Sequence, residues 1–197
     1  MIDPARTALL VIDAQIDFLA MVEDGSHDTC GAQKALAGML RLVEAAQRAG
    51  APIVLTQEAH RASGVDFGRE LDGDEPVHCL EGAPGTELVP ALRDLAGAHV
   101  VRKRRYSAFF ATDLALLLGG LGVDTVVACG FLTDVCVHYT CVDAHQHDLH
   151  VLVARDACAG SSAPASRAAL AAVDYLQRGA VTTVDRLAET YAVAAAA

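Results

Sequence analysis

Short, continuous apolar runs recur along the chain, and each is followed by a segment with helical spacing. The first run covers residues 7–12 and ends in an acid, Asp13. A run that is apolar at every position, rather than at alternate positions, is typical of a parallel strand buried on both faces. Further strands are predicted at residues 52–56, 99–101, 125–129, 149–153 and 180–183.

Helical patterns lie between these runs. In residues 33–49, Leu36, Leu40 and Val43 recur at helical spacing, and Gly50 closes the pattern. The alternation of strand and helix predicts an α/β fold, with a three-layer αβα, doubly wound, Rossmann-like sheet of about six mostly parallel strands. We expect a single domain over residues 1–197. Further helices are predicted at residues 112–118, 134–147, 166–177 and after 183.

Composition narrows the classes of function. The net charge of −10 disfavours a general affinity for nucleic acid or for an anionic membrane. No apolar run is long enough to cross a bilayer, and the first residues lack the pattern of a secretory signal. The six cysteines form no CxxC pair, so we expect reduced thiols and a cytoplasmic protein.

Three reactive side chains follow predicted strands. Asp13 ends the first strand, Lys103 follows the third and Cys136 comes after the fourth. Because ligands bind beyond the carboxyl ends of parallel strands, we expect these side chains at one edge of the sheet. Cys136 also lies in the first turn of a predicted helix, where unpaired N–H groups and the helix dipole favour the thiolate.

Each of these side chains also has a purely structural interpretation. A cysteine here can be an inert core residue, and Asp13 can cap a helix or pair with a base. Lys103 belongs to a basic run, residues 102–105, that can form a solvated face. The residue types nevertheless suit amide hydrolysis, which needs a nucleophile, a proton carrier and stabilisation of the oxyanion.

Four segments together resemble a known family. They are residues 10–18, 76–82, 103–110 and 130–137, and they occur in the family's order along nearly the whole chain. On these segments the chain resembles the isochorismatase-like cysteine hydrolases, which include N-carbamoylsarcosine amidase and nicotinamidases.

The resemblance implies a role for each reactive side chain. Cys136 would be the nucleophile, Asp13 the general base and Lys103 the third member of a catalytic triad. The backbone N–H groups of Leu132 and Cys136 would form the oxyanion hole, and the peptide bond from Phe131 to Leu132 would be cis. The implied enzyme cleaves a C–N bond of a small amide, carbamoyl or ureido substrate through a thioester and releases ammonia or an amine.

Two other functions stay open. One is vinyl ether hydrolysis of the isochorismatase type; the family members with that activity generally lack the nucleophilic cysteine. The other is a non-catalytic binding module on the same fold. The presence of Cys136 speaks against the first, and a complete set of three reactive side chains speaks against the second.

One part of the resemblance is incomplete. Nicotinamidases of this family bind a metal through one Asp and three His, and Glu58 here stands in the place of the Asp. His60 and His78 match two of the histidines, but residues 61–67 contain no third histidine. We therefore expect that the metal site is lost, that zinc is not bound and that the protein has no cofactor.

The expected ligand is a small-molecule substrate. Residues 58–86 form the one long irregular stretch, and loops of this length are usually functional. Phe18, Tyr106 and His60 are candidates to line the substrate pocket, with core packing as the alternative. Because members of the family usually form dimers or larger assemblies, the resemblance also implies a homo-oligomer, either a dimer or a tetramer.

Overall fold

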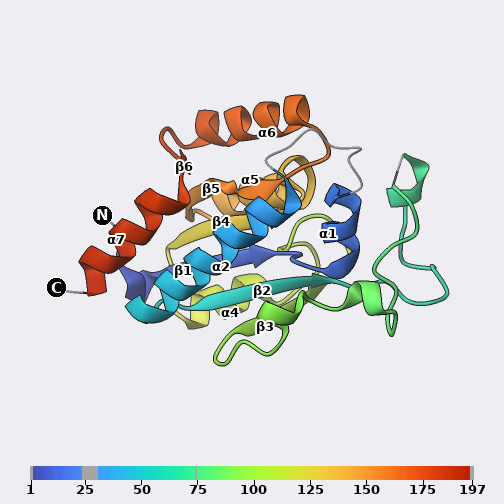
Figure 1. The fold of residues 1–197 in the computed structure, drawn as a ribbon, viewed down its shortest axis with the longest axis horizontal. Coiled ribbons are helices and arrows are strands. Elements are labelled where there is room, and N and C mark those ends of the chain that lie inside the picture. The colour runs from blue at the N-terminus through green and yellow to red at the C-terminus, as the bar shows by residue number, and fades with distance from the viewer. Residues whose placement is uncertain (1, 24–30, 74, 196–197) are drawn as a thin grey trace.

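The computed structural model describes residues 2–23, 31–73 and 75–195, and its centre is one sheet of six strands (Figure 1). From edge to edge the strand order is β3-β2-β1-β4-β5-β6, and every neighbouring pair is parallel. The predicted α/β class and the number of strands are therefore confirmed. The strands are β1 (Thr7–Ile12), β2 (Ile53–Glu58), β3 (His99–Lys103), β4 (Thr125–Phe131), β5 (His150–Ala159) and β6 (Val181–Thr182).

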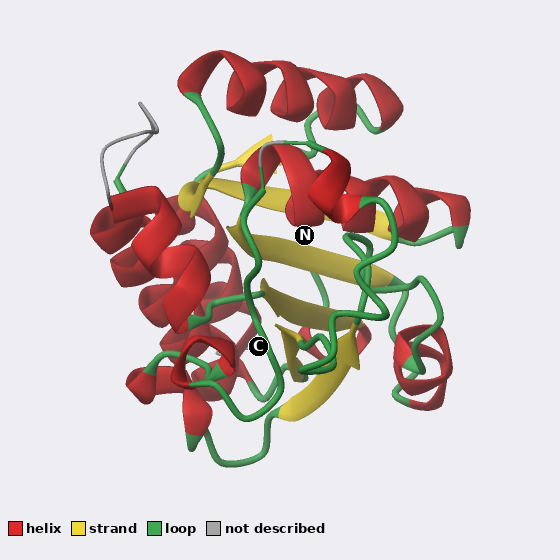
Figure 2. Ribbon diagram, turned by 90° about the vertical axis from the view of Figure 1, so that its right-hand side faces the viewer, coloured by secondary structure: helices red, strands yellow, loops and turns green. Residues whose placement is uncertain are grey.

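Helices cover both sides of the sheet (Figure 2). On one side α2 contacts α1 and α7, and elsewhere α5 contacts α6. None of the helices in the described part of the chain combines the length and the apolar character that a membrane crossing requires. The helices are α1 (Ile16–Glu23), α2 (Ala32–Ala49), α3 (Pro90–Arg93), α4 (Leu114–Gly120), α5 (His138–Gln146), α6 (Ala163–Leu176) and α7 (Val184–Ala195).

The order of the strands creates a switch point in the middle of the sheet. β1 pairs with β2 on one side and with β4 on the other, although β2 and β3 lie between them in the sequence. The chain thus builds one half of the sheet outward from β1 and then returns to build the other half from β4. Ligand sites of such sheets lie at this crevice, beyond the carboxyl ends of the strands.

Gly130 allows the two central strands to meet directly before this crevice. Its φ is 132°, which side chains rarely adopt, and a Cβ at this position would lie 2.0 Å from the carbonyl oxygen of Ile12. A larger residue would therefore push β4 away from β1 at the point where Asp13 and Cys136 converge.

Several elements differ from the sequence-based expectation, among them α3, which was not predicted. α1 was not predicted, because residues 16–23 follow the first strand with almost no intervening loop. β5 has ten residues rather than the five expected, and it continues through the polar pair Arg155 and Asp156. The helix expected from residue 134 begins as a π-helical turn, Thr133–Val137, before α5 continues it.

Candidate active site

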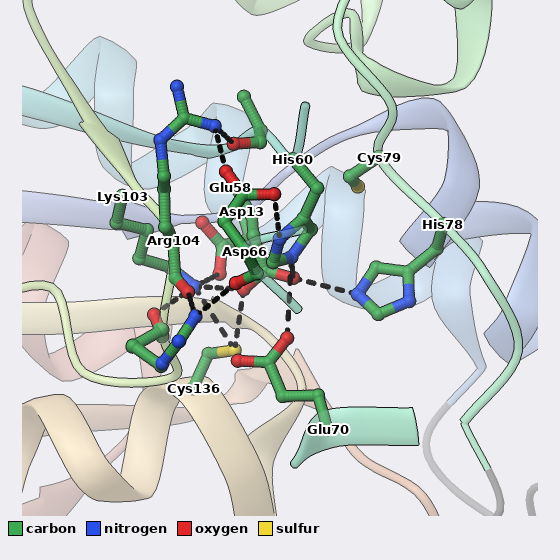
Figure 3. Close-up of polar contacts among 12 residues, drawn as sticks. Asp13, Glu58, His60, Asp66, Glu70, His78, Cys79, Lys103, Arg104 and Cys136 are labelled. Carbon is green, nitrogen blue, oxygen red and sulfur yellow. Dashed lines mark hydrogen bonds and ion pairs between the residues drawn. The ribbon is translucent and has the colours of Figure 1, made fainter. Parts of the chain in front are cut away.

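Asp13, Lys103 and Cys136, called the triad below, meet beyond the carboxyl ends of β1, β3 and β4 (Figure 3). The Lys103 Nζ lies 2.7 Å from Asp13 Oδ2 and 3.4 Å from Cys136 Sγ. An oxygen of the Asp13 carboxylate lies within 4.8 Å of the same sulfur. The structure thus brings together the three side chains that the sequence placed at one edge of the sheet.

Lys103 is a buried cation, not part of a solvated basic face. Its side chain has no exposed surface, and it contacts Asp13, the carboxylate of Glu58 and, at 3.0 Å, the carbonyl oxygen of Arg105. Burial alone would lower the pKa of Lys103, but the negative charges of Asp13 and Glu58 outweigh burial and hold this pKa well above its usual value. The ammonium group therefore stays charged.

Asp13 is positioned by its backbone conformation and by Thr56 as well as by Lys103. Its φ of 49° lies in the left-handed region, which aspartate tolerates better than most residues. The Asp13 N–H donates to Thr56 Oγ1 at 3.0 Å, and the Thr56 hydroxyl donates back to Asp13 Oδ1 at 2.7 Å. Burial raises the pKa of the Asp13 carboxyl, and the charge of Lys103 opposes this shift.

Cys136 lies in the π-helical turn after β4 and is 2% exposed. Burial raises the pKa of its thiol well above the ordinary value, and Lys103 only opposes this shift. The carboxylates of Asp13 and Glu58 raise the pKa further. The thiolate that the start of the helix alone favours is therefore opposed by burial and by the two neighbouring acids.

Glu58, at the end of β2, joins the triad to a second group of side chains. Its Oε2 contacts Lys103 and lies 3.8 Å from Cys136 Sγ, while its Oε1 lies 2.7 Å from His78 Nε2. Gln15 fixes the backbone of Glu58 from both sides, with hydrogen bonds of 2.8 Å to its carbonyl and from its N–H. The sequence singled out Glu58 only as a metal candidate and gave no sign of its contact with Lys103.

His60, Glu70 and His78, called the histidine cluster below, lie on the other side of Glu58 (Figure 3). His60 Nε2 is 3.4 Å from Glu58 Oε1 and 3.3 Å from Glu70 Oε2. One ligand atom from each of these four residues lies within 4.8 Å of the other three. Two imidazoles and two carboxylates form a donor set that fits a divalent metal ion.

Glu70 is the member of this cluster that the sequence analysis missed. It opens the short 3-10 turn Glu70–Asp72, ten positions after His60. The resemblance implies a histidine within residues 61–67, whereas the structure supplies a carboxylate from beyond that window. An acid in a loop rich in acids carries no local signal that would have identified it.

The long loop is tied to the strand that carries Lys103. Arg104, the next residue, contacts Asp66 at 2.9 Å and Glu81 at 2.5 Å. The ring of Phe67 stacks on that of His60, with centroids 3.9 Å apart. These contacts hold the loop, and with it the histidine cluster, against the triad.

The three candidates for the substrate pocket have different environments. Tyr106 lines a pocket of about 460 Å³, and burial raises the pKa of its hydroxyl. Phe18 is 3% exposed and its ring lies 5.3 Å from that of His78, whereas His60 is fully buried within its cluster. The pocket is also lined by Phe67, Glu70, Arg105, Phe110, Tyr139 and Asp143.

The segment named for the oxyanion hole lies between the sheet and the nucleophile. The peptide bond from Phe131 to Leu132 is cis. The Leu132 carbonyl accepts hydrogen bonds from the N–H groups of Val135 and Val137, each at 3.1 Å. These bonds fold the chain tightly around Cys136.

Comparison with known proteins gives a consistent result. The Isochorismatase domain family matches residues 7–186 of the chain. The chain is 31% identical over 182 residues to a nicotinamidase of Acinetobacter baylyi, a match that covers 77% of this chain and 80% of that protein. It is 29% identical over 194 residues to the ureidoacrylate amidohydrolase RutB of Methylobacterium radiotolerans, covering 88% and 75% of the two chains.

A solved structure extends the similarity to three dimensions. The chain superposes on a cysteine hydrolase from Pseudomonas syringae pv. phaseolicola with a TM-score of 0.86 and 27% sequence identity. The superposition covers 98% of this chain and 95% of the other. The two proteins therefore share their fold over essentially the full length of both chains.

Proposed function

The chain belongs to the isochorismatase family, and we propose that it is a cysteine hydrolase that cleaves a C–N bond of a small amide, carbamoyl or ureido substrate. One observation carries the proposal: Lys103 contacts both the carboxylate of Asp13 and the sulfur of Cys136 within a buried site at the switch point of the sheet. A nucleophile, a proton carrier and a fixed positive charge are the groups that amide hydrolysis through a thioester requires.

In the first step, the sulfur of Cys136 attacks the carbonyl carbon of the substrate while its proton passes to the carboxylate of Asp13. The raised pKa of the buried thiol is the reason why a nearby base is needed. The C–N bond then breaks as Asp13 donates that proton to the departing nitrogen. Ammonia or an amine leaves, and the acyl group remains on sulfur as a thioester.

In the second step, water attacks the thioester carbon. Asp13 takes a proton from this water and returns it to the sulfur as the C–S bond breaks, which releases the acid and restores the site. In both steps negative charge develops on the carbonyl oxygen. We assign its stabilisation to the backbone N–H groups of Leu132 and Cys136.

Lys103 has an electrostatic role in this mechanism. Its charge counters the rise in pKa that burial imposes on both Asp13 and Cys136, so that proton transfer between them remains accessible. A divalent metal ion held by Glu58 and the histidine cluster would supply a Lewis-acidic positive charge beside this site.

The pocket beside the site suits a small substrate. Its volume is about 460 Å³ and its walls include the rings of Phe67, Tyr106, Phe110 and Tyr139. Tyr106 follows Lys103 by three positions, and the intervening Arg105 carbonyl accepts from the Lys103 ammonium. The pocket is thus linked to the triad through residues 103–106, although no triad side chain lines it.

The same proposal extends to assembly and location. We expect a homo-oligomer, a dimer or a tetramer, that acts in the cytoplasm. The side chains of Leu116 and Tyr175 are 81% and 89% exposed, which is the kind of apolar surface that contact between subunits would cover.

The hydrolysis of simple amides, carbamoyl amino acids and ureides tests the proposal. Ammonia release would be measured for the wild type, for Cys136→Ala and for Cys141→Ala, each with and without added zinc. Cys141 is a matched control because it is equally buried, at 2% exposed, but lies within α5. We expect Cys136→Ala to lower kcat by at least about a thousandfold, whereas Cys141→Ala keeps most of the activity.

Two results would count against this assignment. Full activity of Cys136→Ala on a substrate that the wild type hydrolyses would exclude the thioester route. Hydrolysis of a vinyl ether by both proteins, with no amide cleaved, would favour the isochorismatase-type reaction instead.

A further inference from the structure

The π-helical turn that carries Cys136 is tied to the chain after β5 by the carboxylate of Asp134. Asp134 Oδ1 accepts a hydrogen bond from the backbone N–H of Ser161 at 2.8 Å, and Asp134 Oδ2 accepts from the Ser161 hydroxyl. Both oxygens of one side chain thus bind a single residue that lies 27 positions further along the chain. Hydrogen bonds to a charged acceptor are stronger than neutral ones. We call this pair of hydrogen bonds the Asp134 clamp.

Gly160 lets the chain after β5 approach the turn closely enough for these bonds. A Cβ at Gly160 would collide with Asp134 Oδ1 and with Ser166 Oγ, and it would lie 3.1 Å from the Cβ of Thr133. Any larger residue would therefore push this loop away from the turn. The contact thus depends on two residues, the glycine that leaves the space and the aspartate that occupies it.

The start of α6 stabilises the negative charge of Asp134. Ser162 is the N-cap residue of this helix, and its hydroxyl accepts from the Ala165 N–H at 3.2 Å. Ser161 directly precedes this cap, so the carboxylate that binds Ser161 lies beside the N-terminal end of a helix of 14 residues. A negative charge is favourable there because the first N–H groups of a helix carry a partial positive charge. The clamp therefore joins the turn both to the end of β5 and to the beginning of α6.

The clamp continues the connection between β4 and β5 beyond the sheet. The pairing of these strands ends at Phe131 and Ala159, and the bonds from Asp134 to Ser161 follow directly. Within the turn, the Leu132 carbonyl already accepts from two N–H groups, which fixes the local shape. The clamp adds a contact that fixes where the turn lies relative to the neighbouring strand.

This position bears on the reaction because of what surrounds Asp134 in the sequence. Leu132 comes two positions before it and Cys136 two positions after it. The proposed mechanism uses the backbone N–H groups of these two residues to stabilise the oxyanion. Donors of this kind act only when they are already in place as the charge develops, and a displacement of about 1 Å can cost about a hundredfold in rate.

We propose that Asp134 is a positioning residue, which holds the N–H groups of Leu132 and Cys136 where the oxyanion forms. The inference rests on the proposed function, because that function assigns the oxyanion to these two groups. Asp134 takes no proton and contacts no substrate in this role. Its removal therefore lowers kcat and kcat/KM together and leaves KM nearly unchanged, as expected for an interaction made only in the transition state.

Three substitutions separate the clamp from general stability. Asp134→Ala removes both hydrogen bonds, whereas Asp134→Asn keeps an oxygen for the Ser161 N–H and an NH₂ group that can donate to the Ser161 hydroxyl. Asp156→Ala is the matched control, because Asp156 is also half-buried and accepts from a distant backbone N–H, that of Val184, at 2.8 Å. That bond ties β5 to the start of α7, which contributes no residue to the triad.

Two measurements are made on each full-length protein. Steady-state ammonia release from the best amide substrate of the wild type gives kcat and KM. Hydrogen–deuterium exchange of the amides of residues 131–137 reports, without any substrate, whether the turn is held.

We expect Asp134→Ala to lower kcat by about 10–100-fold with KM within about threefold of the wild type, because the oxyanion donors are displaced rather than deleted. Exchange in the turn is expected to become about tenfold faster in this variant. Asp134→Asn and Asp156→Ala are expected to keep most of the kcat and the slow exchange of the turn.

A kcat of Asp134→Ala within about threefold of the wild type would overturn the proposal, as would an equal loss of kcat in Asp156→Ala. If Asp134→Ala does not fold, Ser161→Ala takes its place, because it deletes only the hydroxyl that binds Asp134. A lower kcat at unchanged KM in Ser161→Ala would support the clamp, and an unchanged kcat would refute it.

Failure of the hydrolase assignment would give a different result. A wild type that cleaves no amide, with faster exchange of the turn in Asp134→Ala alone, would refute the proposed reaction but not the clamp. Ammonia release that is lost in Cys136→Ala but unaffected in Asp134→Ala would refute only the role of Asp134.

Discussion

The triad and the histidine cluster share Glu58 but differ in which positive charge balances their buried carboxylates. In the triad, the buried acids Asp13 and Glu58 face the ammonium of Lys103, which the chain itself provides. In the histidine cluster, the ion pairs of Glu70 and of the other oxygen of Glu58 within the described part of the chain are with imidazoles alone. The triad therefore carries its own counter-ion, whereas the cluster is complete only with protonated histidines or with an added cation.

The two groups also differ in what holds them. Asp13, Lys103 and Glu58 stand at the ends of strands that are paired on one or both sides. His60, Glu70 and His78 belong to the loop, which is fixed by ion pairs of Arg104 and by ring contacts of Phe67. The triad is therefore held by the pairing of the strands, whereas the histidine cluster is held by side-chain contacts of the loop.

Asp13→Asn is the sharpest test of the triad. Asparagine also tolerates the left-handed backbone at this position and keeps the hydrogen bond with Thr56, so the fold should be retained. Because asparagine cannot carry the proton, we expect kcat to fall by about 10²–10⁴. The measurement is steady-state ammonia release, with Asp124→Asn, an exposed acid that pairs with Arg6, as the control. A kcat close to that of the wild type would remove Asp13 from the mechanism.

Lys103→Met tests whether the triad depends on its internal cation. Methionine fills a similar volume but leaves Asp13 buried without its cation and Glu58 paired only with His60 and His78. We expect the free energy of unfolding to fall by about 3–5 kcal/mol, measured by urea denaturation at neutral pH. Arg102→Met, on the exposed face of the same strand, should change it much less. Equal losses in the two variants would contradict the importance of this cation.

The titration of His60 is expected to have the smallest effect on stability. It tests the histidine cluster rather than the triad. Burial alone would lower the pKa of His60, but hydrogen bonds and charge interactions with Glu58 and Glu70 raise it to about 9, from 6.5. Because the pKa is higher in the folded state, its stabilising effect is full below pH 6.5 and is lost as the pH rises through 9. In metal-free protein we therefore expect the Tm to fall by a few degrees over this interval.

His60→Gln should flatten that dependence, because glutamine does not titrate. Thermal unfolding with chelator present, at several pH values between 6.5 and 9, would compare it with the wild type and with His99→Gln, a substitution on the exposed edge strand β3. Parallel curves for the wild type and His60→Gln would show that the cluster does not hold His60 in its charged form.

The triad could be predicted from the sequence more fully than the histidine cluster. Asp13, Lys103 and Cys136 could be brought to one edge from the sequence because continuous apolar runs mark parallel strands, and parallel strands end at a common edge. The family match over residues 7–186 confirms the resemblance on which their expected roles rest. α1 was missed because only a few residues separate it from β1, and the local pattern there resembled a continuation of the loop.

The histidine cluster could be predicted only in part. His60 and His78 were identified from the resemblance, but Glu70 was not, because a ligand in an irregular loop has no fixed spacing. The raised pKa of Cys136 could not be predicted from the sequence either, since the position of a thiol in a helix is a local property whereas its burial beside two carboxylates is not.

The sequence by itself determined the alternation of strands and helices, and with it the edge of the sheet at which the triad lies. Tertiary structure alone decided that Glu58 bridges two groups and that Glu70 comes within 3.3 Å of His60. The reason is physical: hydrophobic periodicity acts between neighbours along the chain, whereas charges that lie far apart in the sequence interact only after folding has excluded water between them.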